Sequence, residues 1–138
     1  MICDTSALLA AFSADQRFHI ECADTLRNAE RRLVPSTVLA EIDYLSGRIW
    51  GRQSAIRIAR ALAEPAYQIL SHSDQTLLAA SALMESYSDL DVGIVDASLV
   101  IHAKELKTNE IFTLDQRHFR AMRGLDGRHF RLLPFDTE

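Results

Sequence analysis

The chain has 138 residues, 48% of them hydrophobic and 25% charged, with a net charge of −4. These values are typical of a soluble globular domain. The negative net charge argues against a chain that binds nucleic acid through an overall positive charge. No apolar run approaches the ~20 residues of a membrane span, and the first residues lack the basic start of a secretory signal. The two cysteines form no C-x-x-C pair and suit a reducing compartment. We therefore expect a single domain, residues 1–138, in the cytoplasm.

Short apolar runs alternate with longer stretches of helical period along the chain. From the amino terminus, the pattern predicts a strand, two helices, a second strand, and two helices separated by Gly51. A third strand, a helix capped by Ser73, another helix and two more strands follow. This alternation indicates an α/β fold with a mostly parallel sheet covered by helices on both faces. The predicted strands are 1–3, 32–34, 67–70, 111–114 and 130–133, and the predicted helices are 5–12, 18–31, 36–50, 52–63, 74–87 and 96–106.

Two acidic residues stand directly after predicted strands. Asp4 ends the first strand and Asp115 lies just past the fourth. In open parallel sheets, ligands bind in the crevice beyond the carboxyl ends of the strands. Both side chains are therefore candidate site residues, whatever the error in the strand boundaries.

Two further acids stand out by their context on predicted helices. Glu41 lies three residues after Val38 and one before Ile42, so it borders an apolar helix face. An exposed helix acid is the alternative explanation of Glu41. Asp96 precedes a strongly apolar helix, where unpaired backbone N–H groups favour a carboxylate. A plain helix N-cap is the alternative for Asp96.

Converging carboxylates permit a specific chemistry. Like charges within a few ångströms repel one another and raise one another's pKa unless a cation joins them. Hard divalent ions such as Mg²⁺ prefer oxygen ligands, and the absence of a cysteine or paired-histidine pattern favours Mg²⁺ or Mn²⁺ over zinc. The four acids together carry a charge equal to the net charge of −4. His118 follows Asp115 by three residues, and a structural or solvent-facing histidine is its simpler interpretation.

Each of the four acids stands in a short segment of its own. The segments are Ile-Cys-Asp-Thr-Ser-Ala-Leu-Leu (2–9), Val-Leu-Ala-Glu-Ile-Asp-Tyr-Leu (38–45), Gly-Ile-Val-Asp-Ala-Ser-Leu-Val (93–100) and Ile-Phe-Thr-Leu-Asp-Gln-Arg-His-Phe (111–119). These segments resemble the four motifs of the PIN-domain family, with an acid at the expected place in each and in the family's order and spacing over residues 2–119. The length of the chain is similar to that of free-standing VapC toxins of bacterial toxin–antitoxin pairs.

The resemblance implies a three-layer α/β/α fold and metal-dependent cleavage of RNA. It implies that three aspartates gather a Mg²⁺ ion, with Mn²⁺ as an alternative, and that Glu41 helps to position the attacking water. It also implies a homodimer and a cognate VapB-type antitoxin whose tail crosses the site. The implied metal ligands are Asp4, Asp96 and Asp115, and the residues implied to support them by hydrogen bonding are Thr5, Ser6 and Thr113.

Several assignments stay open at this point. Arg117 and Arg120, in an arginine-rich segment, are candidates for RNA phosphate contacts, with a solvated face as the alternative. Asp91 is an accessory ligand or a plain loop aspartate. A non-toxin PIN nuclease and a non-catalytic nucleic-acid-binding module are the alternative functions.

Two other α/β classes fit the sequence less well. A receiver-type signalling domain needs paired acids after the first strand, where only Asp4 stands. A haloacid-dehalogenase-type phosphatase needs a second aspartate two residues after Asp4, and Ser6 occupies that position.

Overall fold

The computed structural model describes residues 1–136 and contains one five-stranded sheet in the order β3-β2-β1-β4-β5. All strand pairs are parallel, so the predicted parallel α/β sheet is confirmed. This strand order also differs from the 2-1-3-4-5 order of receiver domains. The strands are β1 (Ile2–Cys3), β2 (Arg32–Pro35), β3 (Tyr67–Leu70), β4 (Glu110–Phe112) and β5 (Arg131–Leu133).

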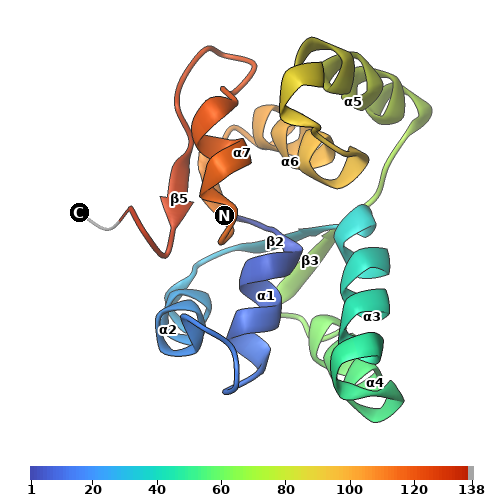
Figure 1. Cartoon of the computed structure of the whole chain (residues 1–138), viewed down its shortest axis with the longest axis vertical. Helices are drawn as coiled ribbons and strands as arrows, with labels where there is room; N and C mark the ends of the chain where they lie inside the picture. Colours follow the sequence, from blue (N-terminus) through green and yellow to red (C-terminus); the bar gives the residue numbers. More distant parts are fainter. Residues whose placement is uncertain (137–138) are drawn as a thin grey trace.

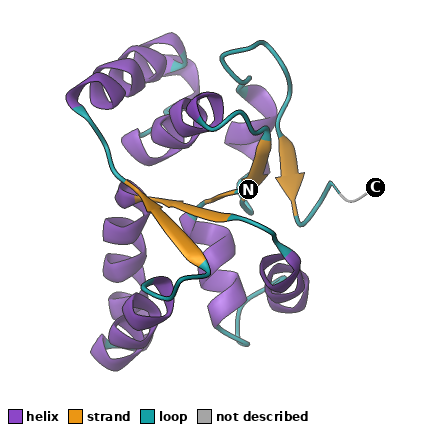
Figure 2. Ribbon diagram, turned by 180° about the vertical axis from the view of Figure 1, so that it is seen from behind, coloured by secondary structure: helices purple, strands orange, loops and turns teal. Residues whose placement is uncertain are grey.

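Helices cover both faces of the sheet and give three layers (Figure 1; Figure 2, seen from behind). One group, α1 to α4, lies on one side, and α5 to α7 lie on the other. Within residues 1–136, no helix has both the length and the apolar character that a bilayer crossing requires. The helices are α1 (Thr5–Phe12), α2 (His19–Asn28), α3 (Ser36–Trp50), α4 (Arg52–Leu62), α5 (Asp74–Ser86), α6 (Ile94–Glu105) and α7 (Gln116–Ala121), with a short 3-10 helix at Ser88–Leu90.

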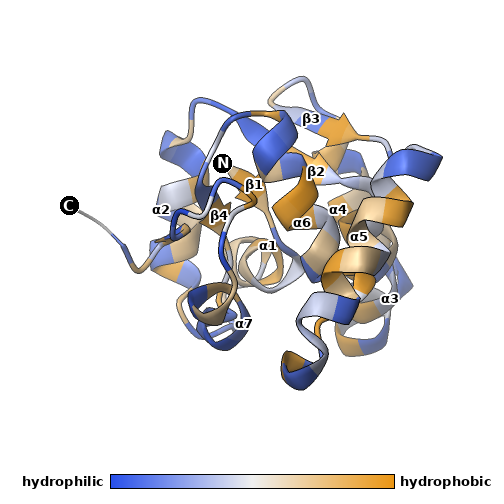
Figure 3. Cartoon of the chain, turned by 90° about the horizontal axis from the view of Figure 1, so that it is seen from above, coloured by the Kyte–Doolittle hydropathy of each residue, from blue (hydrophilic) through white to orange (hydrophobic). Residues whose placement is uncertain are grey.

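The hydrophobic core lies where the central strands meet α6. Figure 3 shows apolar residues along α6 and near β1 and β2, whereas α7 is mostly hydrophilic. Ile2 of β1, Leu99 of α6 and Phe112 of β4 are fully buried, as expected for parallel strands covered on both faces. Burying each such side chain contributes about 1.5–3 kcal/mol. The core therefore holds β1, β4 and α6 rigidly, and all three carry or precede an acid of interest.

The structure corrects the predicted start of the helix that contains Asp96. Helix α6 begins at Ile94 with Gly93 as its N-cap, so Asp96 lies in the first turn rather than at the cap. The explanation of Asp96 as a plain N-cap is therefore wrong. The predicted break at Gly51 is confirmed, because this glycine ends α3 with a φ of 93°, which side-chain-bearing residues rarely adopt. The sequence pattern missed the short helix α7 entirely.

Candidate acidic active site

The site lies at the carboxyl ends of the two central strands. Asp4 follows β1 directly, and Asp115 follows β4 by three residues. The two strands pair in parallel, with Cys3 opposite Phe112. In the sheet, β2 lies on one side of β1 and β4 lies on the other. The gap between β1 and β4 is therefore the point where the strand order reverses. Parallel sheets place ligands at such a point.

Two helices complete the acidic group. Glu41 lies in the second turn of α3, and Asp96 in the first turn of α6. Together with Asp4 and Asp115, they line one open pocket of about 450 Å³. No lysine or arginine within the described part of the chain lines this pocket. The four predicted acids therefore meet in one place, without a permanently charged basic side chain to neutralise them.

Hydroxyl and amide groups hold the carboxylate of Asp4 in place. The backbone N–H of Thr5 donates to Oδ1 of Asp4 over 2.9 Å. The hydroxyl of Thr113 donates to Oδ2 over 2.7 Å, and Ser6 donates to the same oxygen over 3.4 Å. The orientation of Asp4 is thus set by the first turn of α1 and by the residue that follows β4.

The same two hydroxyls also bind the chain that follows β4. Ser6 Oγ accepts the backbone N–H of Leu114 over 3.0 Å, and Thr113 Oγ1 accepts that of Asp115 over 3.0 Å. Asp4 and Asp115 are therefore linked through a shared hydrogen-bond network. Ser6 and Thr113, both expected to support the carboxylates, thus each contact Asp4 and the segment that follows β4.

Burial perturbs the charge of Asp4 most strongly. Only 5% of this residue is exposed, and burial raises the pKa of Asp4 from 3.8 to about 7. The hydrogen bond from Thr113 opposes the rise, while the nearby charges of Asp96 and Glu41 add to it. The ionised form of Asp4 is therefore unfavourable in this surrounding unless a cation lies beside it.

Asp96 has the same kind of perturbation. Burial raises the pKa of Asp96; His118 opposes this rise, and the negative charges of Asp115 and Glu41 add to it. Burial lowers the pKa of His118, but the negative charges of Asp115 and Asp96 together have the larger effect and raise it overall. The site thus has an excess of buried negative charge that one imidazole only partly balances.

Thr5 supports Asp4 through its backbone. Its backbone N–H, and not its side chain, supports Asp4. The Thr5 hydroxyl is buried and makes no hydrogen bond within residues 1–136, although Thr5 lines the acidic pocket. Buried hydroxyls without a partner cost free energy and call for an explanation. A ligand or water in the pocket would provide one.

The donor set fits a hard divalent cation. Asp96, Asp115 and His118 each offer one ligand atom, and these atoms lie within 4.8 Å of one another. Asp4 and Glu41 add carboxylate oxygens to the same pocket. Oxygen-rich sites of this kind suit Mg²⁺ or Mn²⁺, whereas zinc sites favour cysteine and several histidines.

Comparison with known proteins identifies the family. The PIN domain family matches residues 1–125. The chain belongs to the PIN domain family. A relative from Mycobacterium tuberculosis, Ribonuclease VapC26, is 36% identical over 137 residues, which cover 97% of this chain and 100% of the relative.

Solved structures share the fold of this PIN domain. The crystal structure of VapC20 from Mycobacterium tuberculosis, described as a sarcin-ricin loop cleaving toxin, superimposes with a TM-score of 0.78 at 15% identity. The match covers 84% of this chain and 90% of that one. DNA-bound VapBC from Salmonella typhimurium gives a TM-score of 0.68 at 15% identity and covers 95% and 96% of the two chains. These likenesses agree with the predicted three-layer fold.

The remaining candidate residues of this PIN domain lie outside the acidic pocket. Asp91 is in a loop with a φ of 53° and does not line the pocket. Arg117 is exposed on α7. Arg120 binds both carboxylate oxygens of Asp136 at 2.7 Å, so its charge is already compensated. A metal role for Asp91 therefore has no geometric support.

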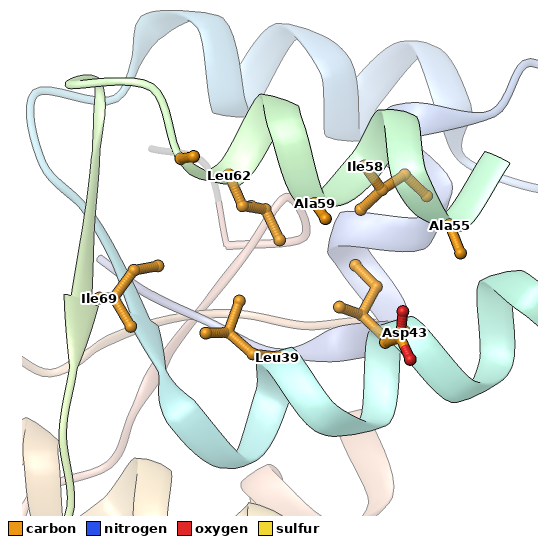
Figure 4. A pocket seen from close by; sticks show the side chains of 9 residues that line it. Leu39, Asp43, Ala55, Ile58, Ala59, Leu62 and Ile69 are labelled. Atoms are coloured by element: carbon orange, nitrogen blue, oxygen red, sulfur yellow. The ribbon is translucent and has the colours of Figure 1, made fainter. Parts of the chain in front are cut away.

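A separate apolar hollow lies between α3 and α4, beside β3 (Figure 4). Its volume is about 280 Å³. Leu39 of α3 faces Ile58 and Leu62 of α4 across it, and Ile69 of β3 closes one end. Among the described residues, Asp43 is the one charged side chain in its lining, and the other lining residues are apolar.

Proposed function

We propose that this PIN domain is a divalent-metal-dependent endoribonuclease and acts as the toxin of a toxin–antitoxin pair. The observation that carries this proposal is the convergence of four carboxylates, from β1, α3, α6 and the end of β4, on one pocket without a lysine or arginine among the residues described. The similarity to a relative named Ribonuclease VapC26 supports it. So does the fold shared with a toxin described as cleaving the sarcin-ricin loop.

Three aspartates would hold the ion. Asp4, Asp96 and Asp115 offer carboxylate oxygens in the pocket, and Mg²⁺ or Mn²⁺ suits such ligands. When bound, the ion lowers the pKa of a water molecule and stabilises negative charge on phosphate oxygens. It would also offset the charge that makes ionised Asp4 and Asp96 unfavourable in the metal-free protein.

The side chains of the protein have separate tasks in the reaction. Thr113 and the Thr5 backbone N–H keep both oxygens of Asp4 oriented. Glu41, half-buried on α3, would orient the attacking water and accept its proton as one P–O bond forms and another breaks. Such positioning of a nucleophile accounts for a large part of phosphodiester catalysis.

The proposed partners follow from the same site. RNA is the proposed substrate, and a VapB-type antitoxin is the proposed inhibitor, as in the solved VapBC complex. An inhibitor that places a basic side chain among the four acids would gain strong charge-assisted hydrogen bonds. The buried, free thiols of Cys3 and Cys22 suit the reducing cytoplasm as the place of action.

The test is RNA cleavage by carboxylate-to-amide variants. We expect Asp4→Asn, Asp96→Asn and Asp115→Asn each to lower the rate at least about 100-fold, because the ion loses a charged ligand. Glu41→Gln should have a similar or milder effect. Asp43→Asn is the matched control, since Asp43 lies on α3 outside the acidic pocket.

Circular dichroism should be unchanged in every variant, and EDTA should abolish wild-type cleavage until Mg²⁺ or Mn²⁺ is restored. Wild-type activity in Asp96→Asn, or activity that EDTA leaves untouched, would refute the proposed function.

A further inference from the structure

His118 lies between two of the acids of the site. Its Nδ1 atom is 2.9 Å from Oδ2 of Asp96 and 2.9 Å from Oδ2 of Asp115. The ring is mostly buried, with 18% of the side chain exposed. Helix α7 places it there, because the backbone N–H of His118 binds Oδ1 of Asp115 over 3.1 Å. One oxygen of Asp115 therefore caps α7, and the other faces the imidazole.

These separations match those of ligands that share one ion. Octahedral ions hold their ligand atoms at about 2.1 Å, so neighbouring ligand atoms lie about 3.0 Å apart. The two Nδ1–Oδ2 separations of 2.9 Å have this length. The three ligand atoms of Asp96, Asp115 and His118 lie within 4.8 Å of one another, close enough to share one ion.

The direction of the imidazole is also compatible with a shared ion. Nδ1 of His118 is a buried atom that makes no properly directed hydrogen bond to any group within residues 1–136, despite the two short separations. Neighbouring ligands of one octahedral ion have this relation, because the nitrogen lone pair points about 45° away from each neighbouring oxygen. The ring is thus close to both carboxylates without being directed at either.

A further observation indicates a ligand beside these carboxylates. The buried hydroxyl of Thr5, in the pocket that Asp96 and Asp115 also line, makes no hydrogen bond in the described part of the chain. Buried polar atoms without a partner are rare in folded proteins and call for an explanation.

We propose that His118 is a direct nitrogen ligand of the metal ion, beside Asp96 and Asp115, and that it makes the site prefer Mn²⁺ over Mg²⁺. This inference rests on the proposed metal-dependent function. Mg²⁺ strongly prefers oxygen ligands, whereas first-row transition ions also accept imidazole. The four acids alone provide no such discrimination, so the nitrogen of His118 determines it.

The decisive measurement uses Mn²⁺ as a spectroscopic probe. Metal-free wild-type protein is loaded with Mn²⁺ in a nitrogen-free buffer, and electron spin echo envelope modulation detects any ¹⁴N nucleus bound to the ion. We expect the ¹⁴N modulation of a coordinated imidazole. It should disappear in His118→Gln, whose amide can still donate a hydrogen bond to the carboxylates. It should persist in His129→Gln, the matched control at an exposed histidine.

Calorimetric titration with Mn²⁺ and with Mg²⁺ provides the second readout. The ratio of the two affinities should fall at least about tenfold in His118→Gln, since loss of even a supporting residue weakens metal binding by 10–100-fold. Mn²⁺ binding and RNA cleavage by the wild type without ¹⁴N modulation would overturn the role of His118 and leave the proposed function standing. A wild type that neither binds Mn²⁺ nor cleaves RNA would overturn both.

Discussion

In the metal-free protein, the buried carboxyl of Asp4 should weaken folding as the pH rises. Burial raises the pKa of Asp4 from 3.8 to about 7 in the folded protein, whereas the unfolded chain keeps the ordinary value. Between these two values, the unfolded state gives up the proton of Asp4 and the folded state retains it. Stability therefore falls as the pH rises through this window, and Asp4→Asn should remove this part of the pH dependence.

The magnitude follows from the pKa difference. Each pH unit within the window corresponds to ~1.36 kcal/mol, so the full effect is on the order of 4 kcal/mol by about pH 7. This is a large fraction of the ~5–15 kcal/mol by which domains are stable. A divalent ion should restore part of it: tenfold excess over its dissociation constant contributes about 1.4 kcal/mol, or roughly 3–8 °C in the melting temperature.

The assay is urea unfolding in EDTA at several pH values from 4 to 8, for the wild type and Asp4→Asn. The free energy of unfolding of the variant minus that of the wild type should increase with pH. Loss of the hydrogen bonds that Asp4 accepts shifts this difference by a constant and leaves its slope intact. Asp43→Asn, at an exposed acid of α3, is the control and should show no slope.

A difference between wild type and Asp4→Asn that stays constant over this range would refute the reasoning. Asp4 would then ionise as freely in the folded protein as in the unfolded chain. The same result would mean that burial and the charges of Asp96 and Glu41 do not make ionised Asp4 unfavourable.

Two other experiments test the contacts of the protein with RNA and with its partner. Arg117→Ala should weaken RNA binding and reduce the slope of log affinity against log salt concentration by about 0.7, the value for one phosphate contact on a single strand. Arg120→Ala should change this slope less, because Asp136 already neutralises Arg120. Unchanged slopes in both variants would assign these arginines to the solvated surface. Expression of the chain alone should arrest growth. Co-expression with the product of a short upstream reading frame should relieve the arrest and yield a complex that co-purifies. A chain that is harmless alone and recovers no partner would contradict the toxin assignment.

The positions of Asp4 and Asp115 could be predicted because they depend on a coarse feature of the sequence. Each acid follows an apolar run, and parallel strands place their carboxyl ends at one edge of the sheet. The predicted fourth strand extended to Leu114, while β4 ends at Phe112. This error did not matter, because Asp115 still follows the strand. Glu41 and Asp96 needed the family resemblance, since periodicity alone also allows an exposed acid or a cap.

Other features depend on details that a pattern of residue types does not contain. The pairing of Arg120 with Asp136 joins residues sixteen positions apart through a turn after β5. The position of His118 beside Asp96 depends on α7, a helix of six residues that is too short to show a periodic apolar face. The i, i+3 spacing of Asp115 and His118 was visible in the sequence, but this spacing brings side chains together only on a helix.

Capping and catalysis are not competing explanations for the acids of this site. Asp4 is the N-cap of α1 and Asp115 the N-cap of α7, and each uses Oδ1 to accept a backbone N–H. The cap holds one oxygen of each carboxylate in place, and the positive end of the helix stabilises its charge. Oδ2 of each residue is then directed into the site, toward Thr113 from Asp4 and toward His118 from Asp115. An aspartate that stands between a strand and the following helix therefore has one carboxylate oxygen fixed by the backbone of that helix. Asp96, which is not a cap, depends instead on burial beside His118, and its orientation should be the more sensitive of the three to replacement of that histidine.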